Sequence, residues 1–133
     1  MYDQILNILT ASWSRKTSTK WTEDCPAKGQ CGVTALVIQD VYGGDILKTK
    51  TGTSWHFYNR IDGEIYDFTS GQFSEPIVYQ HILSSRDEAF SDTDEHQYRF
   101  LKSAFRKNME SAFRKNMESA FRKNMETERE KHL

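Results

Sequence analysis

The apolar positions of this chain recur first at helical spacing and later at strand spacing. Apolar residues within 5–9 lie three and four positions apart, which predicts a helix over 2–13. The segment 12–28 is polar and has no regular period. The next run, 30–41, is mostly apolar, and its length and the two glycines that follow favour a buried helix over a strand. Cys31 falls in the first turn of that helix.

Strand patterns follow directly. Residues 45–50 indicate a strand that ends at a turn over 51–52. The strongest local pattern is a hairpin, in which the runs 55–61 and 64–70 flank the Asp-Gly dipeptide at 62–63. Asp-Gly is a preferred two-residue hairpin turn. The sequence therefore predicts an antiparallel sheet beside a buried helix.

The two-residue turn fixes which side chains share a face of the hairpin. Its register begins with Ile61 opposite Glu64, and it places His56 opposite Thr69 and diagonal to Asp67. One face is apolar and is the expected core face, with Trp55, Phe57, Ile61, Tyr66 and Phe68. The other face is unusually polar for strands against a buried helix, with His56, Tyr58, Arg60, Ile65, Asp67 and Thr69.

The last third of the chain is polar and largely helical. A mixed segment, 73–82, surrounds Pro76. Asp92 or Thr93 is expected to cap a helix that has acidic residues in its first turn. This helix is predicted to run through 98–101 and on into the C-terminal tail.

The tail contains one octapeptide, Ser-Ala-Phe-Arg-Lys-Asn-Met-Glu, three times without a change, at 103–110, 111–118 and 119–126. Identity this complete indicates recent duplication of coding sequence or engineering. Arg and Glu alternate every four residues, which supports a helix. Phe and Met also recur every four residues, so the apolar stripe drifts about 40° per step and winds around the helix without forming a heptad seam. The repeat is either a partly solvated extension of the helix or an oligomerisation surface.

Length and charge restrict the class of protein. The chain has 133 residues and a net charge of -1, which fits a single domain and an extension. Residues 103–133 carry eight basic and five acidic side chains, a balance of +3, which leaves -4 for residues 1–102. Neither part has the basic patch of a nucleic-acid-binding surface. We therefore expect no nucleic-acid partner.

Targeting and cysteine patterns point to the cytoplasm. No run of about 18 apolar residues is present, and the N-terminus lacks the basic start and apolar stretch of a signal peptide. We expect a cytoplasmic protein with no membrane partner. Cys25 and Cys31 are then reduced thiols, and their spacing is not that of a zinc site. The other histidines have no ligand-like spacing, so no metal or cofactor is expected.

Three residues together suggest nucleophilic chemistry. Cys31 at a helix N-terminus gains positive partial charge, which lowers the pKa of a thiol. His56 is placed to take its proton, and Asp67 to fix the imidazole tautomer. Gln30 is a candidate for stabilising an oxyanion together with first-turn N–H groups, although it would also serve as a simple cap. Each residue alone also has an ordinary structural explanation, since isolated cysteines in apolar helices are mostly small buried hydrophobes.

The ordered combination of residues between Trp21 and Leu101 resembles the YunG-like family of small bacterial proteins. The resemblance is carried by Gly29-Gln30-Cys31, Thr34-Ala35-Leu36, Gln39-Asp40, Gly43-Gly44, His56-Phe57-Tyr58-Asn59-Arg60, Gly63, Asp67-Phe68-Thr69, Gln72-Phe73, Arg86 and Tyr98-Arg99-Phe100-Leu101. It implies the extent of the domain and no particular reaction. The octapeptide array is not part of this pattern.

The sequence thus predicts an α+β protein in two parts. Residues 1–102 form a small papain-like or transglutaminase-like domain, in which the cysteine helix packs on an antiparallel sheet, and 103–133 form a helical extension. The leading hypothesis is a cysteine hydrolase or acyltransferase, with Cys31, His56, Asp67 and Gln30 at its site and a small molecule or peptide as substrate. The alternatives are a non-catalytic ligand- or peptide-binding domain and a module that self-associates through the C-terminal helix.

Overall fold

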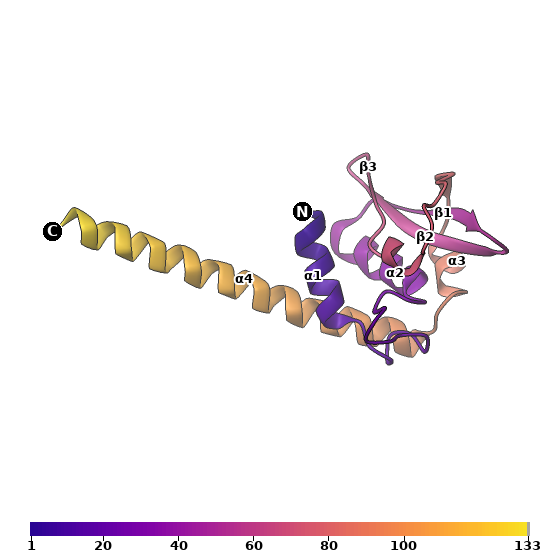
Figure 1. Ribbon diagram of the computed structural model, residues 1–133, viewed down its shortest axis with the longest axis horizontal. Coiled ribbons are helices and arrows are strands. Elements are labelled where there is room, and N and C mark those ends of the chain that lie inside the picture. Colours follow the sequence, from indigo (N-terminus) through magenta and orange to yellow (C-terminus); the bar gives the residue numbers. More distant parts are fainter. Residues whose placement is uncertain (133) are drawn as a thin grey trace.

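The structure, a computed structural model, describes residues 1–132 (Figure 1). It is an α+β fold in which two helices precede a hairpin, and a long helix ends the chain. Its elements are α1 (Tyr2–Ser12), α2 (Cys31–Tyr42), β1 (Asp45–Thr51), β2 (Ser54–Ile61), β3 (Glu64–Tyr66), the 3-10 turn η1 (Ser70–Gln72), β4 (Ile82–Leu83), α3 (Arg86–Phe90) and α4 (Glu95–Lys131). The predicted first helix, cysteine helix and first strand are confirmed, whereas β4 and α3 had no clear signal in the sequence.

The four strands form one antiparallel sheet in the order β3-β2-β1-β4. The predicted hairpin register is confirmed at its start, where Ile61 pairs with Glu64. The predicted second strand is too long, because β3 ends at Tyr66. Asp67 turns its carboxylate back to accept the backbone N–H of Thr69 at 3.2 Å, and this local bond draws the chain out of the ladder and into η1.

Helix α2 packs against the sheet, as predicted. All residues from Cys31 to Ile38 are buried, because the helix is covered on several sides. Toward the sheet, its side chains pack with Ile46 and Phe57. The side-chain amide of Asn59 donates to the Ala35 carbonyl at 3.0 Å, which ties β2 to the helix. This packing sets the start of α2 against β2.

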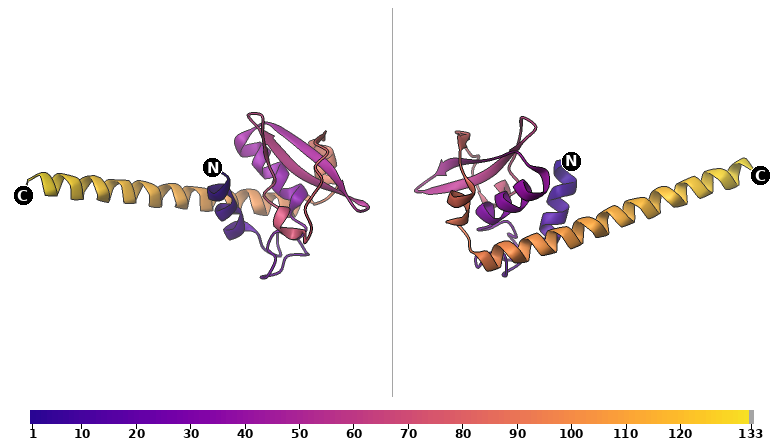
Figure 2. Two further views of the ribbon diagram at one scale, coloured as in Figure 1. Left: turned by 45° about the horizontal axis from the view of Figure 1, so that its top comes forward. Right: turned by 180° about the vertical axis from the view of Figure 1, so that it is seen from behind.

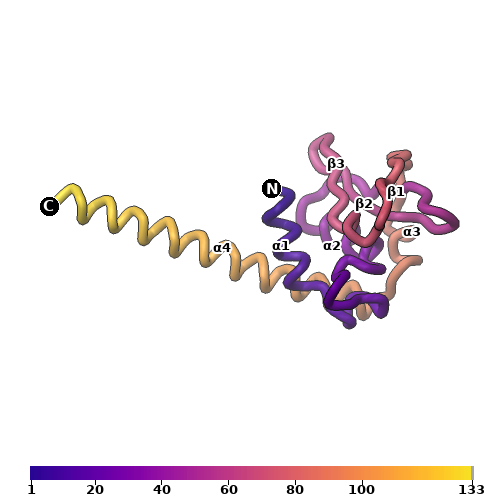
Figure 3. Tube along the Cα trace, in the orientation of Figure 1, coloured from indigo at the N-terminus to yellow at the C-terminus, as the bar shows by residue number. Residues whose placement is uncertain are grey.

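The second face of α2 is covered by α1 and the first part of α4. Ile5 and Leu9 of α1 pack with Leu101 and Phe105 of α4 in the main core. The views in Figure 2 and the trace in Figure 3 show α1 lying against the N-terminal half of α4, while the C-terminal half, coloured orange to yellow, projects beyond every other element. The core therefore ends partway along α4.

Helix α4 begins at a different cap from the one predicted. Asp94 is the N-cap, and its carboxylate accepts the backbone N–H of Gln97 at 2.8 Å. Asp92 is not available for that position, because its carboxylate is directed toward the start of α2. The helix then continues without interruption through all three octapeptide units, as predicted.

None of the helices in residues 1–132 is both long and apolar enough to cross a membrane. Within the same residues, no group of three or more His, Cys, Asp or Glu side chains is arranged to hold a metal ion.

Candidate functional site

Cys31 opens α2, and a carboxylate from outside the helix meets it there. The Cys31 thiol donates to Asp92 Oδ2 over 3.3 Å, and the same oxygen accepts the backbone N–H of Gly32 at 3.1 Å. Asp92 follows α3 in the chain, so the loop that leads into α4 supplies a cap for α2. A carboxylate at a helix N-terminus is electrostatically favourable there.

The close approach of this loop depends on the absence of a side chain at Gly32. A Cβ at this position would lie 2.7 Å from the Ala89 carbonyl oxygen and 2.7 Å from Asp92 Oδ2. Real Cβ atoms do not tolerate such contacts with backbone. Gly32 therefore allows the α3–α4 loop to sit on the cysteine.

The resting thiol is held in its protonated form. Burial, and then the charge of Asp92, raises the pKa of Cys31 to about 12, whereas the nearby backbone N–H of Phe57 opposes that rise. The helix N-terminus was expected to lower the pKa of Cys31, but in this structure the pKa is raised. Burial likewise raises the pKa of Asp92.

His56 and Asp67 form a buried pair, as the hairpin register predicted. His56 Nε2 lies 2.7 Å from Asp67 Oδ2, and both residues are buried. The Tyr79 hydroxyl donates to the same oxygen at 2.7 Å, and Thr69 donates its backbone N–H and its hydroxyl to Asp67 Oδ1. Burial, and then the bond to Asp67, raises the pKa of Tyr79, which keeps the phenol a donor. These donors replace the water that the carboxylate has lost.

The second ring nitrogen of His56 remains free. Nδ1 is buried and has no hydrogen-bond partner among residues 1–132. If Asp67 accepts the proton on Nε2, Nδ1 carries a lone pair and is a proton acceptor. The ring is fixed by Tyr58, which stacks on it with centroids 5.9 Å apart, and by Phe73, which meets it edge-on at 4.8 Å.

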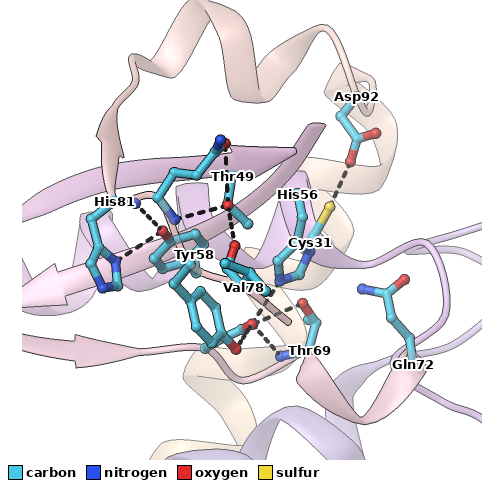
Figure 4. Close-up of polar contacts among 12 residues, drawn as sticks. Cys31, Thr49, His56, Tyr58, Thr69, Gln72, Val78, His81 and Asp92 are labelled. Atoms are coloured by element: carbon cyan, nitrogen blue, oxygen red, sulfur yellow. Dashed lines mark hydrogen bonds and ion pairs between the residues drawn. The ribbon is translucent and has the colours of Figure 1, made fainter. Parts of the chain in front are cut away.

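Figure 4 draws Cys31 and His56 in one view, with the Cys31 thiol directed to Asp92. After burial and the charge of Asp92, the charge of Asp67 is a lesser cause of the raised pKa of Cys31. No hydrogen bond joins the thiol to the imidazole, because the thiol is bonded to Asp92.

Two glutamine side chains from segments that flank Cys31 and follow Asp67 have buried amide atoms without hydrogen-bond partners among residues 1–132. Gln30 is fully buried, and neither its side-chain oxygen nor its nitrogen has a partner among residues 1–132. Gln72 accepts the Gly29 backbone N–H through Oε1 at 3.2 Å, but its Nε2 is buried without a partner. In Figure 4 the Gln72 amide nitrogen points toward the space beside His56. Buried amides without partners are costly, so such groups indicate a bound water or ligand.

Sequence reasoning found the His–Asp pair but missed three contributors. The sequence pattern predicts Asp92 or Thr93 as a helix cap, and Tyr79 lies in a segment without a regular period. Gln72 was only one of the residues that carried the family resemblance. No sequence signal links Asp92 to Cys31, because the contact spans 61 positions and depends on where α3 packs.

Fold and site define a class: a small α+β protein with a buried cysteine at a helix start and a buried His–Asp pair on the adjoining sheet. The family model described as YunG protein matches residues 1–110, and the chain belongs to the YunG family.

One relative is "Uncharacterized protein YunG" of Bacillus subtilis (strain 168), which is 62% identical over 107 residues, covering 80% of this chain and 93% of the relative. No solved structure gives a significant match. The family match ends at Glu110, so it includes the first octapeptide unit and excludes the second and third.

Proposed function

We propose that this protein is a cysteine-dependent hydrolase or acyltransferase that acts on an amide, ester or thioester of a small molecule or peptide. The observation that carries the proposal is the buried His56–Asp67 pair, 2.7 Å apart, whose ring Nδ1 has no partner among residues 1–132. Cys31 begins the helix that packs on the same sheet. A pair with this geometry orients an imidazole to accept a proton from a nucleophile. The order Cys, His, Asp along the chain supports the proposal by analogy with papain-like and transglutaminase-like enzymes.

In the first step, the Cys31 sulfur attacks the substrate carbonyl carbon while its proton passes to His56 Nδ1. The carbon–oxygen double bond becomes a single bond, and the oxygen takes the negative charge. Collapse of this intermediate breaks the bond to the leaving amine, alcohol or thiol, which receives the proton from His56. The acyl group is then held as a thioester on Cys31.

In the second step, water or another nucleophile attacks the thioester and gives its proton to His56. Collapse releases the acid or the transferred acyl product, and the proton returns to the Cys31 sulfur. Asp67 stays ionised throughout and stabilises the imidazolium that forms in each half-reaction. General-base activation during attack makes a pre-formed thiolate unnecessary, which is consistent with the raised pKa of Cys31.

The substrate oxygen would take the place of Asp92 Oδ2. That oxygen accepts the Gly32 N–H, the donor that an oxyanion at this place would use, and it lies next to the Cys31 sulfur. The unpartnered Gln30 amide is a further group for stabilising the oxyanion or positioning the substrate. Substrate binding would therefore require the α3–α4 loop to withdraw its carboxylate.

Access also requires movement of the segment between η1 and β4. Phe73 lies against His56, and Tyr79 bonds to Asp67. His81 bonds to the Tyr58 hydroxyl through its ring and its backbone N–H. Because His56 is only 1% exposed, this segment must open before a substrate reaches the ring.

The test uses an activated ester, p-nitrophenyl acetate, and intact-protein mass spectrometry. The wild-type chain should gain one acetyl group at Cys31, because the ester carries its own good leaving group and needs no substrate recognition. His56→Asn should slow acetylation of Cys31 by at least tenfold, within the range of a lost general base.

Two matched variants control for folding and for thiol chemistry elsewhere. Cys25→Ser should leave acetylation of Cys31 at the wild-type rate, because Cys25 makes no hydrogen bond to Cys31, His56 or Asp67. His132→Asn should also keep the rate, because this histidine is exposed at the C-terminal end of α4. Acetylation of Cys31 that is equally fast in His56→Asn, or that is absent while Cys25 reacts, would rule the proposal out.

A second candidate function is a non-catalytic binding domain. It is favoured by the Asp92 contact, which keeps the Cys31 thiol protonated and covers the first-turn N–H of Gly32. In that case the buried amides of Gln30 and Gln72 would hold a polar ligand or peptide. An unreactive Cys31 in every variant, together with a normal fold, would support this function over catalysis.

A further inference from the structure

The second half of α4 exposes a row of large apolar side chains. Phe113, Met117, Phe121 and Met125 are 66%, 57%, 66% and 54% exposed. We name this row the Phe/Met ridge. Figure 1 shows that the helix projects away from the other elements over this part. A contiguous apolar row of this kind on a monomer marks an interaction surface.

The first octapeptide unit shows how these side chains pack when other elements of the fold cover them. In the first unit, Phe105 is fully buried against α1 and the α2 core, Met109 packs beside it, and Asn108 donates to the Ser12 hydroxyl at 2.9 Å. The second and third units carry the same Phe, Asn and Met with no such cover.

The packed part of the chain, which ends near Met109 and is called the body below, cannot cover the second and third units. Eight residues turn an α-helix by about 80° beyond two whole turns, so the Phe–Met face of the second unit points about 80° away from that of the first. The face of the third unit points about 160° away. A body that packs on Phe105 therefore lies on the wrong side of the helix for Phe121.

We infer that the ridge is covered by a second copy of this chain, in a two-fold symmetric dimer of α4 helices. A four-residue row is a natural packing ridge, and beside it runs a lower row of Ala112, Asn116, Ala120 and Asn124. In the dimer, the Phe/Met ridge of one α4 helix fits into the groove that separates the Phe/Met ridge and the lower row of the partner helix. Packing of four-residue ridges sets the helices at a crossing angle of about −50°, unlike a coiled coil.

The charges of the repeat are compatible with this pairing. The ridge and the lower row contain no ionisable side chain, while Arg, Lys and Glu occupy the two remaining rows of the helix. Pairing thus buries apolar surface without desolvating a charge. The apolar surface also continues toward the body, because Phe113 lines a groove of about 570 Å³ between α1 and α4.

A second copy fits the ridge better than a membrane surface does. The ridge drifts by about 40° per step and turns through about 120° from Phe113 to Met125, so its four side chains cannot lie together on a flat surface. A helix that crosses at an angle follows this winding. From their exposure, the four side chains offer roughly 500 Å² per copy, which is the size of a weak, concentration-dependent interface.

The test is sedimentation equilibrium of the full chain from low micromolar to several hundred micromolar concentration. The wild-type chain should pass from monomer to dimer. The double variant F113S/F121S should weaken association by at least tenfold, whereas F113M/F121M, which keeps the ridge apolar, should dimerise like the wild type. Both variants should retain the wild-type helix content and melting temperature in dilute solution, because each phenylalanine is 66% exposed in the monomer.

The alternatives give distinct results. A wild-type chain that stays monomeric at every concentration, or a dimer that survives F113S/F121S, would overturn the inference. So would binding of the helix to vesicles of anionic phosphatidylserine without any dimer. The inference does not depend on the acyl-transfer proposal, since the dimer is measured without any reaction.

Discussion

At the scale of single residues, the contact that governs this site is the one between Cys31 and Asp92. Two carboxylates lie near the thiol, and they act differently. Asp67 is compensated by four donors and is positioned to orient His56. Asp92 bonds to the thiol itself and, after burial, is the largest contributor to its raised pKa. The reactivity of Cys31 should therefore depend on the charge at position 92.

Asp92→Asn should lower the pKa of Cys31 and raise its rate of alkylation by iodoacetamide. The amide keeps an oxygen for the Gly32 N–H but removes the negative charge that opposes the thiolate. Well below the pKa, each unit of lowering raises the thiolate fraction tenfold. We expect a rate increase of about tenfold at pH 8, measured by mass spectrometry at Cys31.

Asp94→Asn is the matched control for this variant. Asp94 caps α4 and makes no contact with Cys31, and asparagine is an equally good cap. Its alkylation rate should equal that of the wild type. A rate in Asp92→Asn that is unchanged or slower would show that Asp92 does not suppress the thiol.

At the scale of elements, α4 shows that identical sequence does not give identical burial. Phe105 and Phe121 occupy the same position of the same octapeptide, and the first is fully buried while the second is 66% exposed. The difference comes from helical phase and from the length of the body, which ends near Met109. The contribution of a repeat residue to the free energy of unfolding therefore depends on its tertiary contacts.

Phe105→Ala should destabilise the protein by about 3–5 kcal/mol, because it leaves a cavity among tightly packed core side chains. Phe121→Ala, the same substitution in the same local sequence, should change the free energy of unfolding by less than about 0.5 kcal/mol in dilute solution. Urea unfolding at low concentration measures both. Equal effects of the two substitutions would contradict the observed packing of α4.

At the scale of the whole molecule, the body and the exposed end of α4 are separable. The family match stops at Glu110, and the residues of the candidate site lie between Gln30 and Asp92. The packed core of the body ends with the first octapeptide unit. The second and third units thus add a surface and no support for the site.

Deletion of 111–126 should leave the melting temperature and the acetylation rate of Cys31 unchanged, while it abolishes concentration-dependent dimerisation. The first two results follow because no core residue is removed, and the third because the Phe/Met ridge is removed. Differential scanning calorimetry, the ester assay and sedimentation measure the three quantities. A large fall in melting temperature at low concentration would show that the exposed helix supports the body.

Local patterns determined much of this protein. Apolar periodicity located α1, α2 and β1, and the Asp-Gly turn set the register of β2 and β3, which starts with Ile61 opposite Glu64. These predictions succeed because helix and hairpin periods are properties of neighbouring residues. The same reasoning placed the octapeptides in one helix.

Only the tertiary structure decided the rest. It ended β3 at Tyr66, because the Asp67 carboxylate bonds the backbone at Thr69. It also set Asp92 on the thiol across 61 positions, and so raised a pKa that the helix start alone was expected to lower. Burial and long-range charge depend on which elements pack together, and no local period encodes that.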